Sequence, residues 1–206
     1  SNHSIGQIFA DTINNNIFFN SIKFNILNKN NQIKSEFSIA IKDVKKVDDK
    51  YFSFAASGLV GIFYIDKNLK SNWDFIYEKN KNVNFSGFNQ VALLINTNGK
   101  STEYNAINNT IYYATNNGLI AVTNDGKNKE LKHNNETLFL IKIQKYKDKI
   151  IGLSTAEKLY CFDSKNKVTV FKLPYFIAKE KFNRFFIRNQ YCYLFSVNSV
   201  YEYDFE

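Results

Sequence analysis

Apolar and polar residues alternate with a period of two along most of the chain, and clusters of Asn, Asp, Gly and Lys interrupt the alternation about every ten residues. Short alternating runs of this kind are typical of antiparallel strands, whose successive side chains point to opposite faces of a sheet. Clear runs are 38–41, 138–143 and 167–171, and clear turn signals are 48–50, 98–100, 124–127 and 163–166. The sequence has no long stripe of period 3.6 with cap and stop signals, so it predicts an all-β fold.

One unit of this pattern recurs along the chain. Its clearest copy is 108–122, in which a turn and a strand are followed by the turn Asn116-Asn117-Gly118 and a further strand. Related copies are 49–66, 148–163 and 189–204, with a fainter one at 5–26. The apolar residue after the second turn is Ile22, Leu59, Leu119, Leu159 or Val200, and the last four are spaced by 60, 40 and 41 positions.

A period near 40 with four short strands per unit is typical of the β-propeller. We therefore expect a propeller-like array of about five four-stranded antiparallel blades, and the pattern leaves open whether the ring is partial. The expected repeats are 1–37, 38–80, 81–137, 138–175 and 176–206. About 20 extra residues, from roughly 67 to 99, are either an insertion or a degenerate blade. A β-sandwich is the alternative, but it does not explain the recurring unit.

The repeat makes predictions for individual residues. Leu59, Leu119, Leu159 and Val200 are expected at equivalent buried positions of successive blades. Gly118 and Gly58 are expected at positive φ, because a tight reversal needs a residue without Cβ strain. The 20 Phe and 13 Tyr are expected between the blades, since both faces of a blade must be covered.

The charge of the chain restricts its partners. The formal net charge is +8, but Arg184 and Arg188 are the only arginines among 27 basic residues. Bidentate recognition of bases and phosphates depends on Arg, and the lysines alternate with apolar residues, as in 141–147. We therefore expect solvated strand faces and no nucleic-acid partner. The sequence also lacks an apolar run long enough for a membrane helix, so no membrane contact is expected from this segment.

The start of the chain gives one further expectation. Residues 1–4 lack the features of a signal peptide, and the chain begins inside a repeat, so we expect it to be part of a longer protein.

The sequence contains no recognised catalytic motif. Cys161 and Cys192 have apolar neighbours, which favours buried thiols over a disulfide, and His3 and His133 lack metal-site spacing. We expect His133 in a solvated turn and no metal or cofactor. The acids Asp43, Asp48, Asp49, Asp66, Asp163 and Asp204 are expected mainly at turns or strand ends, where they cap backbone amides. The prediction is that the chain has no catalytic residues and is not an enzyme.

The segment 111–119 resembles the two-component regulator propeller repeat, whose usual pattern is Leu-Trp-Ile-Gly-Thr-x-x-Gly-Leu. Thr115, Gly118 and Leu119 match this pattern, whereas Tyr112 replaces its Trp and Ala114 its first Gly. The opening segment 1–11 is similar to the inner-strand segment of that family. The later copies lack the second Gly.

This resemblance implies a sensor. Members of the family form the periplasmic part of Bacteroidetes histidine kinases, including hybrid two-component systems, and many respond to glycan fragments. The implied function is a non-catalytic periplasmic sensor with an oligosaccharide ligand, partnered by adjacent signalling domains of the same chain or by another propeller. A homodimer is left open, and the sequence assigns no ligand-binding residue. The alternative is a propeller scaffold for protein–protein interaction.

Overall fold

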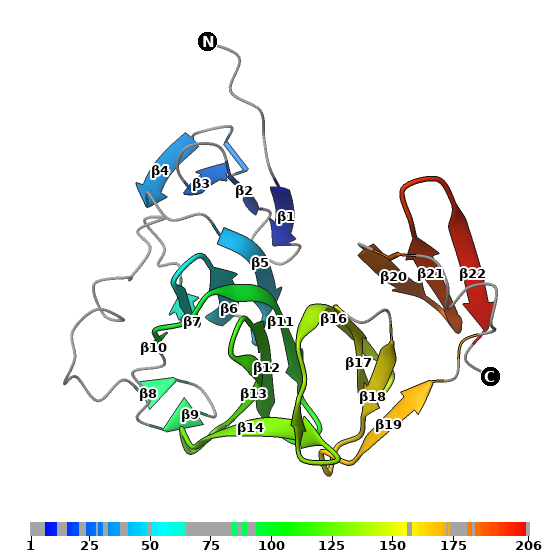
Figure 1. Ribbon diagram of the computed structural model, residues 1–206. Helices are drawn as coiled ribbons and strands as arrows, with labels where there is room; N and C mark the ends of the chain where they lie inside the picture. Colours follow the sequence, from blue (N-terminus) through cyan, green and yellow to red (C-terminus); the bar gives the residue numbers. More distant parts are fainter. Residues whose placement is uncertain are drawn as a thin grey trace.

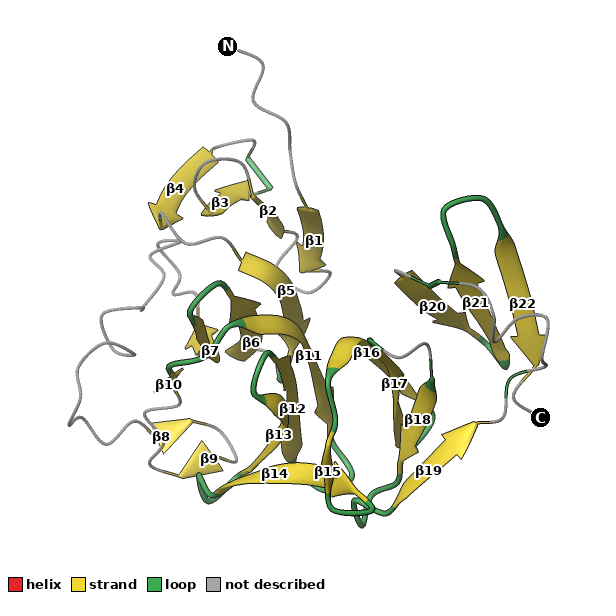
Figure 2. Cartoon of the chain, in the orientation of Figure 1, coloured by secondary structure: helices red, strands yellow, loops and turns green. Residues whose placement is uncertain are grey.

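In the computed structural model of the chain, the described residues are 7–11, 16–20, 24–27, 29–30, 33–37, 41–48, 51–64, 84–85, 88–89, 94–155, 158–171, 173, 181–182 and 184–204. Their regular structure is entirely strand (Figure 2). The described part of the chain holds no helical segment of the length and hydropathy that a membrane crossing requires.

The strands form five main antiparallel sheets, which we call blades 1 to 5. Blade 1 contains β1 (Gln7–Asp11), β2 (Asn16–Asn20), β3 (Phe24–Leu27) and β4 (Ile33–Phe37). Blade 2 contains β5 (Ile41–Lys46), β6 (Tyr51–Ala56), β7 (Leu59–Tyr64) and β10 (Leu94–Ile95). Blade 3 contains β11 (Gly99–Asn105), β12 (Thr110–Thr115), β13 (Gly118–Thr123), β14 (Asn128–His133) and β15 (Glu136–Thr137).

Blade 4 contains β16 (Leu140–Tyr146), β17 (Lys149–Ser154), β18 (Leu159–Phe162) and β19 (Val168–Phe171). Blade 5 contains β20 (Arg184–Arg188), β21 (Tyr191–Phe195) and β22 (Val200–Asp204). A separate two-stranded hairpin consists of β8 (Asn84–Phe85) and β9 (Phe88–Asn89).

The five blades are arranged in an arc (Figure 1). Their first strands, β1, β5, β11, β16 and β20, line the inner side of the arc, and strands such as β4, β14 and β19 lie at its periphery. Each inner strand contacts the inner strand of the next blade. The all-β, propeller-like array of about five blades is therefore confirmed, with three to five described strands in each blade.

The 60-residue spacing between the second and third repeats is explained by the pairing of β10. This strand follows the β8–β9 hairpin in the chain, yet it pairs antiparallel with β7 and so provides the fourth strand of blade 2. In the chain, the β8–β9 hairpin therefore lies between the third and the fourth strand of blade 2.

The inner strands share an irregularity that fixes which side chains are equivalent. In blades 2, 3 and 4 the register with the second strand shifts by one residue, between Ile41 and Asp43, between Gly99 and Ser101, and between Leu140 and Lys142. A bulge of this kind turns the following side chain relative to the regular pleat. After the bulge, Asp43, Ser101 and Lys142 occupy the same position, and Arg184 of β20 occupies it in blade 5.

The core lies between blades rather than within any single one. Four clusters of buried side chains join blades 1 and 2, 2 and 3, 3 and 4, and 4 and 5. The adjacent residues Tyr112 and Tyr113 are both fully buried, because one faces blade 4 and the other faces blade 2. The Tyr113 hydroxyl donates a hydrogen bond of 2.9 Å to the Gly61 carbonyl of blade 2. The aromatic residues therefore fill the spaces between blades, as predicted.

Both glycines that were expected at positive φ adopt it, with φ of 84° at Gly58 and 113° at Gly118. Their places in the two turns differ, however. Ala56 pairs with Leu59 across the Ser57-Gly58 turn, whereas Thr115 pairs with Gly118 itself. Leu59 is therefore equivalent in register to Gly118, and Val60 is the equivalent of Leu119.

The prediction of four equivalent buried residues is only partly correct. Leu59, Leu119 and Leu159 are buried, but Val200 is 60% exposed. Val200 has the register of Leu159, because it pairs with Phe195 as Leu159 pairs with Leu153. Val200 is exposed because of its place in the arc. Leu159 is covered by blade 5, whereas no described blade covers the face of blade 5 that points away from blade 4.

Candidate functional site

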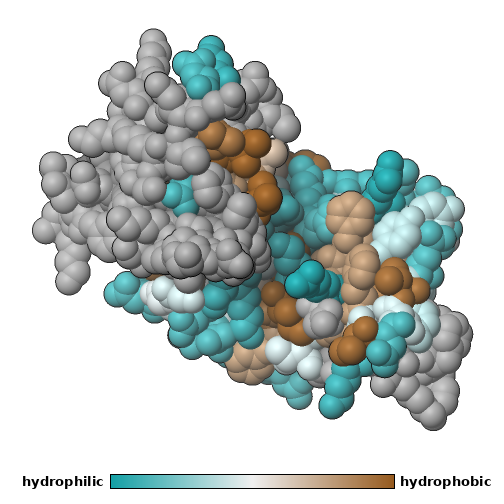
Figure 3. All heavy atoms as spheres, turned by 90° about the horizontal axis from the view of Figure 1, so that it is seen from above, coloured by the Kyte–Doolittle hydropathy of each residue, from teal (hydrophilic) through white to brown (hydrophobic). Residues whose placement is uncertain are grey.

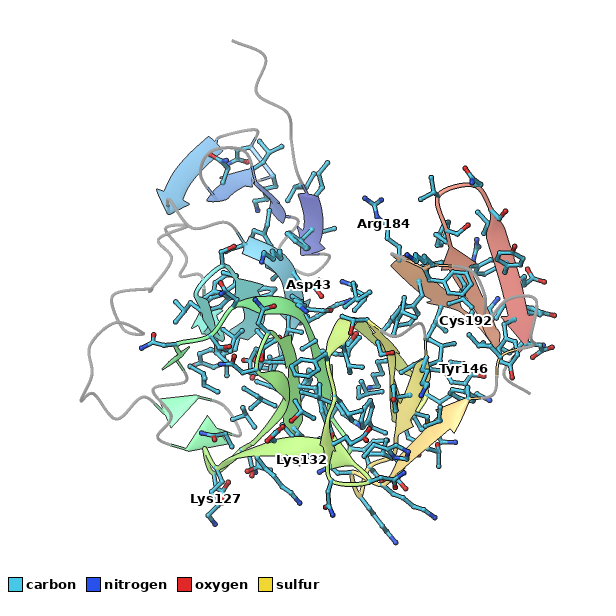
Figure 4. All side chains as sticks on the ribbon, viewed as in Figure 1. Asp43, Lys127, Lys132, Tyr146, Arg184 and Cys192 are labelled. Atoms are coloured by element: carbon cyan, nitrogen blue, oxygen red, sulfur yellow. The ribbon has the colours of Figure 1, made fainter. Side chains whose placement is uncertain are left out.

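A buried polar cluster lies on the inner side of the arc around Asp43 (Figure 4). Its Oδ2 atom accepts hydrogen bonds from Ser101 Oγ at 2.5 Å, from the Thr102 amide at 3.1 Å and from Lys142 Nζ at 2.7 Å. Asp43 as a whole residue is 3% exposed, and Ser101 and Thr102 are fully buried. A buried carboxylate needs such partners, because an unpaired charge inside a protein is strongly destabilising. Its three donors come from blades 3 and 4, so the cluster ties three inner strands together.

The same kind of contact recurs at the next two junctions. Glu103 of β11 accepts a hydrogen bond of 3.0 Å from the amide of Lys145 in β16. Gln144 of β16 accepts one of 2.9 Å from the Ile187 amide of β20 and donates one of 3.0 Å to the Ile187 carbonyl. At each junction a polar side chain of one inner strand therefore satisfies backbone groups of the next. These side chains hold the blades in place, and their polar atoms are largely occupied.

A groove lies between blades 4 and 5, at the ends of their inner strands. It has a volume of about 400 Å³ and is lined by Lys145, Tyr146, Lys147, Ile187, Asn189 and Gln190. The residues come from two places, the end of β16 with its following turn and the end of β20 with its following turn. Tyr146 also packs against the core between the two blades, and the Lys147 ammonium lies 5.2 Å from the centre of its ring.

The groove combines chemical groups that suit a polar ligand. An aromatic ring offers an apolar face, two amides can donate and accept hydrogen bonds, and two lysines provide positive charge with no carboxylate in the lining. Unlike the side chains of the Asp43 cluster, these groups line an open groove between two blades. We therefore take it as the candidate ligand-binding site. The sequence assigns no ligand-binding residue, because its aromatic residues are abundant in the core as well, and the two turns of the groove lie about 40 residues apart in the chain.

The two cysteines are buried and free. Both belong to the core between blades 4 and 5. Burial raises the pKa of the Cys192 thiol to about 12 and also raises that of Cys161. A thiol with a raised pKa is a poor nucleophile, so the buried structural role predicted for both residues is confirmed.

His133 does not lie in a turn, as the sequence suggested. It is the last residue of β14, and its ring lies edge-on to Tyr160, with 5.7 Å between ring centroids. The turn is formed by the next two residues, Asn134 and Asn135, which both have positive φ. Within the described ranges, no three His, Cys, Asp or Glu side chains are grouped as a metal site would require.

The acids divide into two groups. Asp48 and Asp163 cap turns as predicted, since the Asp48 carboxylate accepts a hydrogen bond from the Tyr51 amide and Asp163 accepts from the amides of Lys165 and Lys167. Asp204 ends strand β22, and Asp49 and Asp66 lie outside the described residues. For Asp43 a turn or strand-end position is wrong, because the residue is buried within β5.

No family model matches the chain, and no curated protein matches it. Solved structures do resemble it. Virginiamycin B lyase from Staphylococcus aureus aligns with a TM-score of 0.61 at 13% identity, over 96% of this chain and 68% of the lyase. A catalytically inactive variant of that lyase with quinupristin aligns with the same TM-score at 12% identity, over 98% of this chain and 70% of the other.

Two further similar structures come from extracellular or surface proteins. The extracellular domain of a hybrid two-component system from B. thetaiotaomicron aligns with a TM-score of 0.68 at 13% identity. PorZ, a surface component of the type-IX secretion system of Porphyromonas gingivalis, aligns with a TM-score of 0.64 at 9% identity. The two alignments cover 98% and 99% of this chain, respectively, but only 26% of each of the other two proteins. At these identities the likeness shows the fold.

The comparisons correct the prediction that the chain is not an enzyme. Lyases are among the proteins that share its fold, so the propeller architecture does not argue against catalysis. The physical reason is that activity depends on a few side chains placed on a fold and not on the fold itself.

Proposed function

We propose that this chain is part of an extracytoplasmic, periplasmic sensor of a two-component signalling protein, and that it binds glycan fragments in the groove between blades 4 and 5. The resemblance of segment 111–119 to the regulator propeller repeat supports the signalling role. The structural likeness to the extracellular domain of a hybrid two-component system supports it independently.

The observation that carries the binding site is the composition of the groove. The ring of Tyr146, over which the Lys147 ammonium lies, offers a flat face on which a pyranose can stack in place of that ammonium. The amides of Asn189 and Gln190 suit hydroxyl groups. Lys145 and Lys147 provide donors for hydroxyl or carboxylate oxygens. A saccharide presents apolar C–H faces and many hydroxyls, which matches this mixture.

The position of the groove suggests how binding is relayed. A ligand that contacts both the end of β16 and the turn after β20 bridges two blades. Such a ligand favours one relative arrangement of the blades, in proportion to its difference in affinity between arrangements. Gln144 and Ile187 join the same two strands by two hydrogen bonds, so a shift of blade 5 would be felt along β16.

The test is a binding screen with neutral and acidic oligosaccharides of defined length, measured by thermal shift and isothermal titration calorimetry. We expect at least one oligosaccharide to raise the unfolding temperature, and Tyr146→Ala and Lys145→Gln to weaken its binding. Lys129→Gln is the matched control, because it removes the same charge from an exposed position on the peripheral strand β14. If no oligosaccharide binds, or if all three variants behave alike, the proposed site is wrong.

The same incubations are analysed for products by chromatography, because lyases share the fold. Binding without turnover agrees with a sensor. Turnover that is lost in Tyr146→Ala would instead make this groove a catalytic site.

A protein-interaction scaffold is a second candidate function. It is favoured by exposed apolar side chains on the end blades, including Ile8 at 64% and Val200 at 60% exposure. A scaffold would bind no oligosaccharide in the screen and would bind another protein surface through these faces.

A further inference from the structure

The two faces of each blade have distinct, fixed roles in this fold. In each of blades 2 to 5, the residue at the position of Asp43 pairs with a residue of the second strand, and that residue pairs with one of the third strand. We call these three residues a cross-strand row. The rows are Asp43–Ala55–Val60 in blade 2, Ser101–Ala114–Leu119 in blade 3, Lys142–Leu153–Leu159 in blade 4 and Arg184–Phe195–Val200 in blade 5. These rows lie on the face of each blade that points toward the following blade, which we call the forward face.

The forward faces of blades 2, 3 and 4 are covered. Val60 packs with residues of blade 3, Leu119 with residues of blade 4 and Leu159 with residues of blade 5. All three side chains are fully buried. The covering blade presents its opposite face, which we call the backward face, and this face contributes residues such as Ile111, Ile150 and Ile187. Every junction in the described arc therefore joins a forward face to a backward face.

Blade 5 has a forward face of the same kind without a cover among the described residues. Val200 is 60% exposed and Phe186 is 48% exposed. The ring of Phe186 contacts that of Tyr193 in a tilted arrangement, with 6.4 Å between centroids. Tyr193 is the register equivalent of Ile151 of blade 4, which is fully buried. The position of Val200, which is buried at three junctions, is thus apolar and exposed at the fourth.

The backward face of blade 1 is exposed in the same way. Phe9 and Phe18 point toward blade 2 and belong to its core. The alternate residues of the same two strands point away from blade 2, and Ile8 is 64% and Ile17 41% exposed. Figure 3 views the molecule from the side of the two end blades and shows apolar side chains at the surface there.

We propose that these two faces are docking surfaces for one or more further propeller blades, supplied by sequence other than these 206 residues, which bridge blade 5 to blade 1 and close the arc into a ring. A blade is the expected occupant, because the Arg184–Phe195–Val200 row has the register that receives a blade at three other junctions. At the opposite end, blade 1 exposes Ile8 and Ile17 on the face turned away from blade 2. The size of the lyase is consistent with further blades, because the alignment covers 96% of this chain but only 68% of the lyase chain.

The covering blade can be described chemically. Toward Val200 and Phe186 it presents aliphatic or aromatic side chains, as blade 4 does toward Leu119.

The experiment is thiol labelling of the natural gene product, in its full length, with single substitutions Val200→Cys and Ile17→Cys. The native Cys161 and Cys192 are buried and protonated, so they give little background. Ile107→Cys is the control, because Ile107 lies in the turn between β11 and β12 and is 64% exposed. All variants are also labelled in denaturant, where their rates should be equal.

We expect the cysteines at positions 200 and 17 to react about tenfold or more slowly than the cysteine at position 107, in a protein whose mass by light scattering is that of one chain. Equal rates at all three positions would show that the faces are uncovered and overturn the proposal. Slow labelling in a particle of twice the mass would also overturn it, since a second copy would then cover the faces.

Discussion

Lys142 and Asp43 form an ion pair with 2.7 Å between Nζ and Oδ2, and it joins the inner strands of two blades that are not neighbours. Ser101, from the strand between them, donates a hydrogen bond to the same oxygen. The Asp43 side chain is 4% exposed, whereas 34% of the Lys142 side chain remains exposed. The lysine can therefore be solvated without its partner, but the carboxylate depends on the cluster.

Asp43→Ala should lower the free energy of unfolding by about 3 kcal/mol, because the Thr102 amide and the Ser101 hydroxyl lose a buried acceptor. Asp43→Asn should cost less, since an amide oxygen still accepts these bonds. Urea unfolding followed by circular dichroism measures both. Asp148→Ala, at an exposed turn, is the control and should change stability by less than about 0.5 kcal/mol. A loss for Asp43→Ala no larger than that of the control would contradict the structural role.

Leu119→Ala and Val200→Ala compare one register position in two environments. The first should lower the free energy of unfolding by about 2–4 kcal/mol through lost burial and a cavity, since Leu119 is fully buried. The second should change it by less than about 0.5 kcal/mol in the 206-residue chain, because Val200 is mostly exposed. Chemical unfolding of both variants under one condition tests the pair, and equal losses would be inconsistent with the exposure of blade 5.

Gly118→Ala should be more destabilising than Gly58→Ala. Both residues have positive φ, which costs an L-residue about 1–2 kcal/mol. A Cβ at Gly118 would in addition lie 2.8 Å from Thr137 Cγ2, whereas at Gly58 it would meet nothing within 4 Å. The melting temperatures of the two variants give the order. The reverse order would show that the turn of blade 3 has room that the structure does not provide.

Because the Cys192 thiol is buried, the free energy of unfolding should decrease in alkaline solution. Burial raises the pKa of its thiol to about 12, above the value near 9 of an exposed thiol. The native state therefore keeps this proton when the unfolded state has lost it, so stability falls between about pH 9 and pH 12, by roughly 1.4 kcal/mol for each pH unit. The difference in unfolding free energy between wild type and Cys192→Val isolates this contribution. A difference that does not vary with pH in this range would contradict the raised pKa.

The fold was accessible from the sequence because two signals agree in it. The period-two alternation defines the strands, and the recurrence of segment 108–122 near every 40 residues defines the blades. The turn glycines were predictable for a local reason, since the conformation of Gly118 depends on its immediate neighbours.

The polar cluster was not accessible in this way. Asp43 resembles a strand-end acid in the sequence, and it is buried only because the bulge after Ile41 turns it toward donors 58 to 99 residues away. Val200 shows the opposite effect, because its pattern is that of a core residue and its environment depends on a face of blade 5 that no described blade covers. The groove is formed by two turns about 40 residues apart, and no local pattern relates Tyr146 to Gln190.

The sharing of each core cluster between two blades determines where the molecule opens first. Blade 3 is held by clusters on both of its faces, whereas blades 1 and 5 are each held on one. In an array coupled only through neighbours, the free energy of local opening decreases from the middle toward the ends. The backbone amide hydrogens of β12 and β13 should therefore exchange with solvent most slowly in the 206-residue chain, and those of β21 and β22 much faster. The two ends of the arc should thus open locally while its middle stays folded.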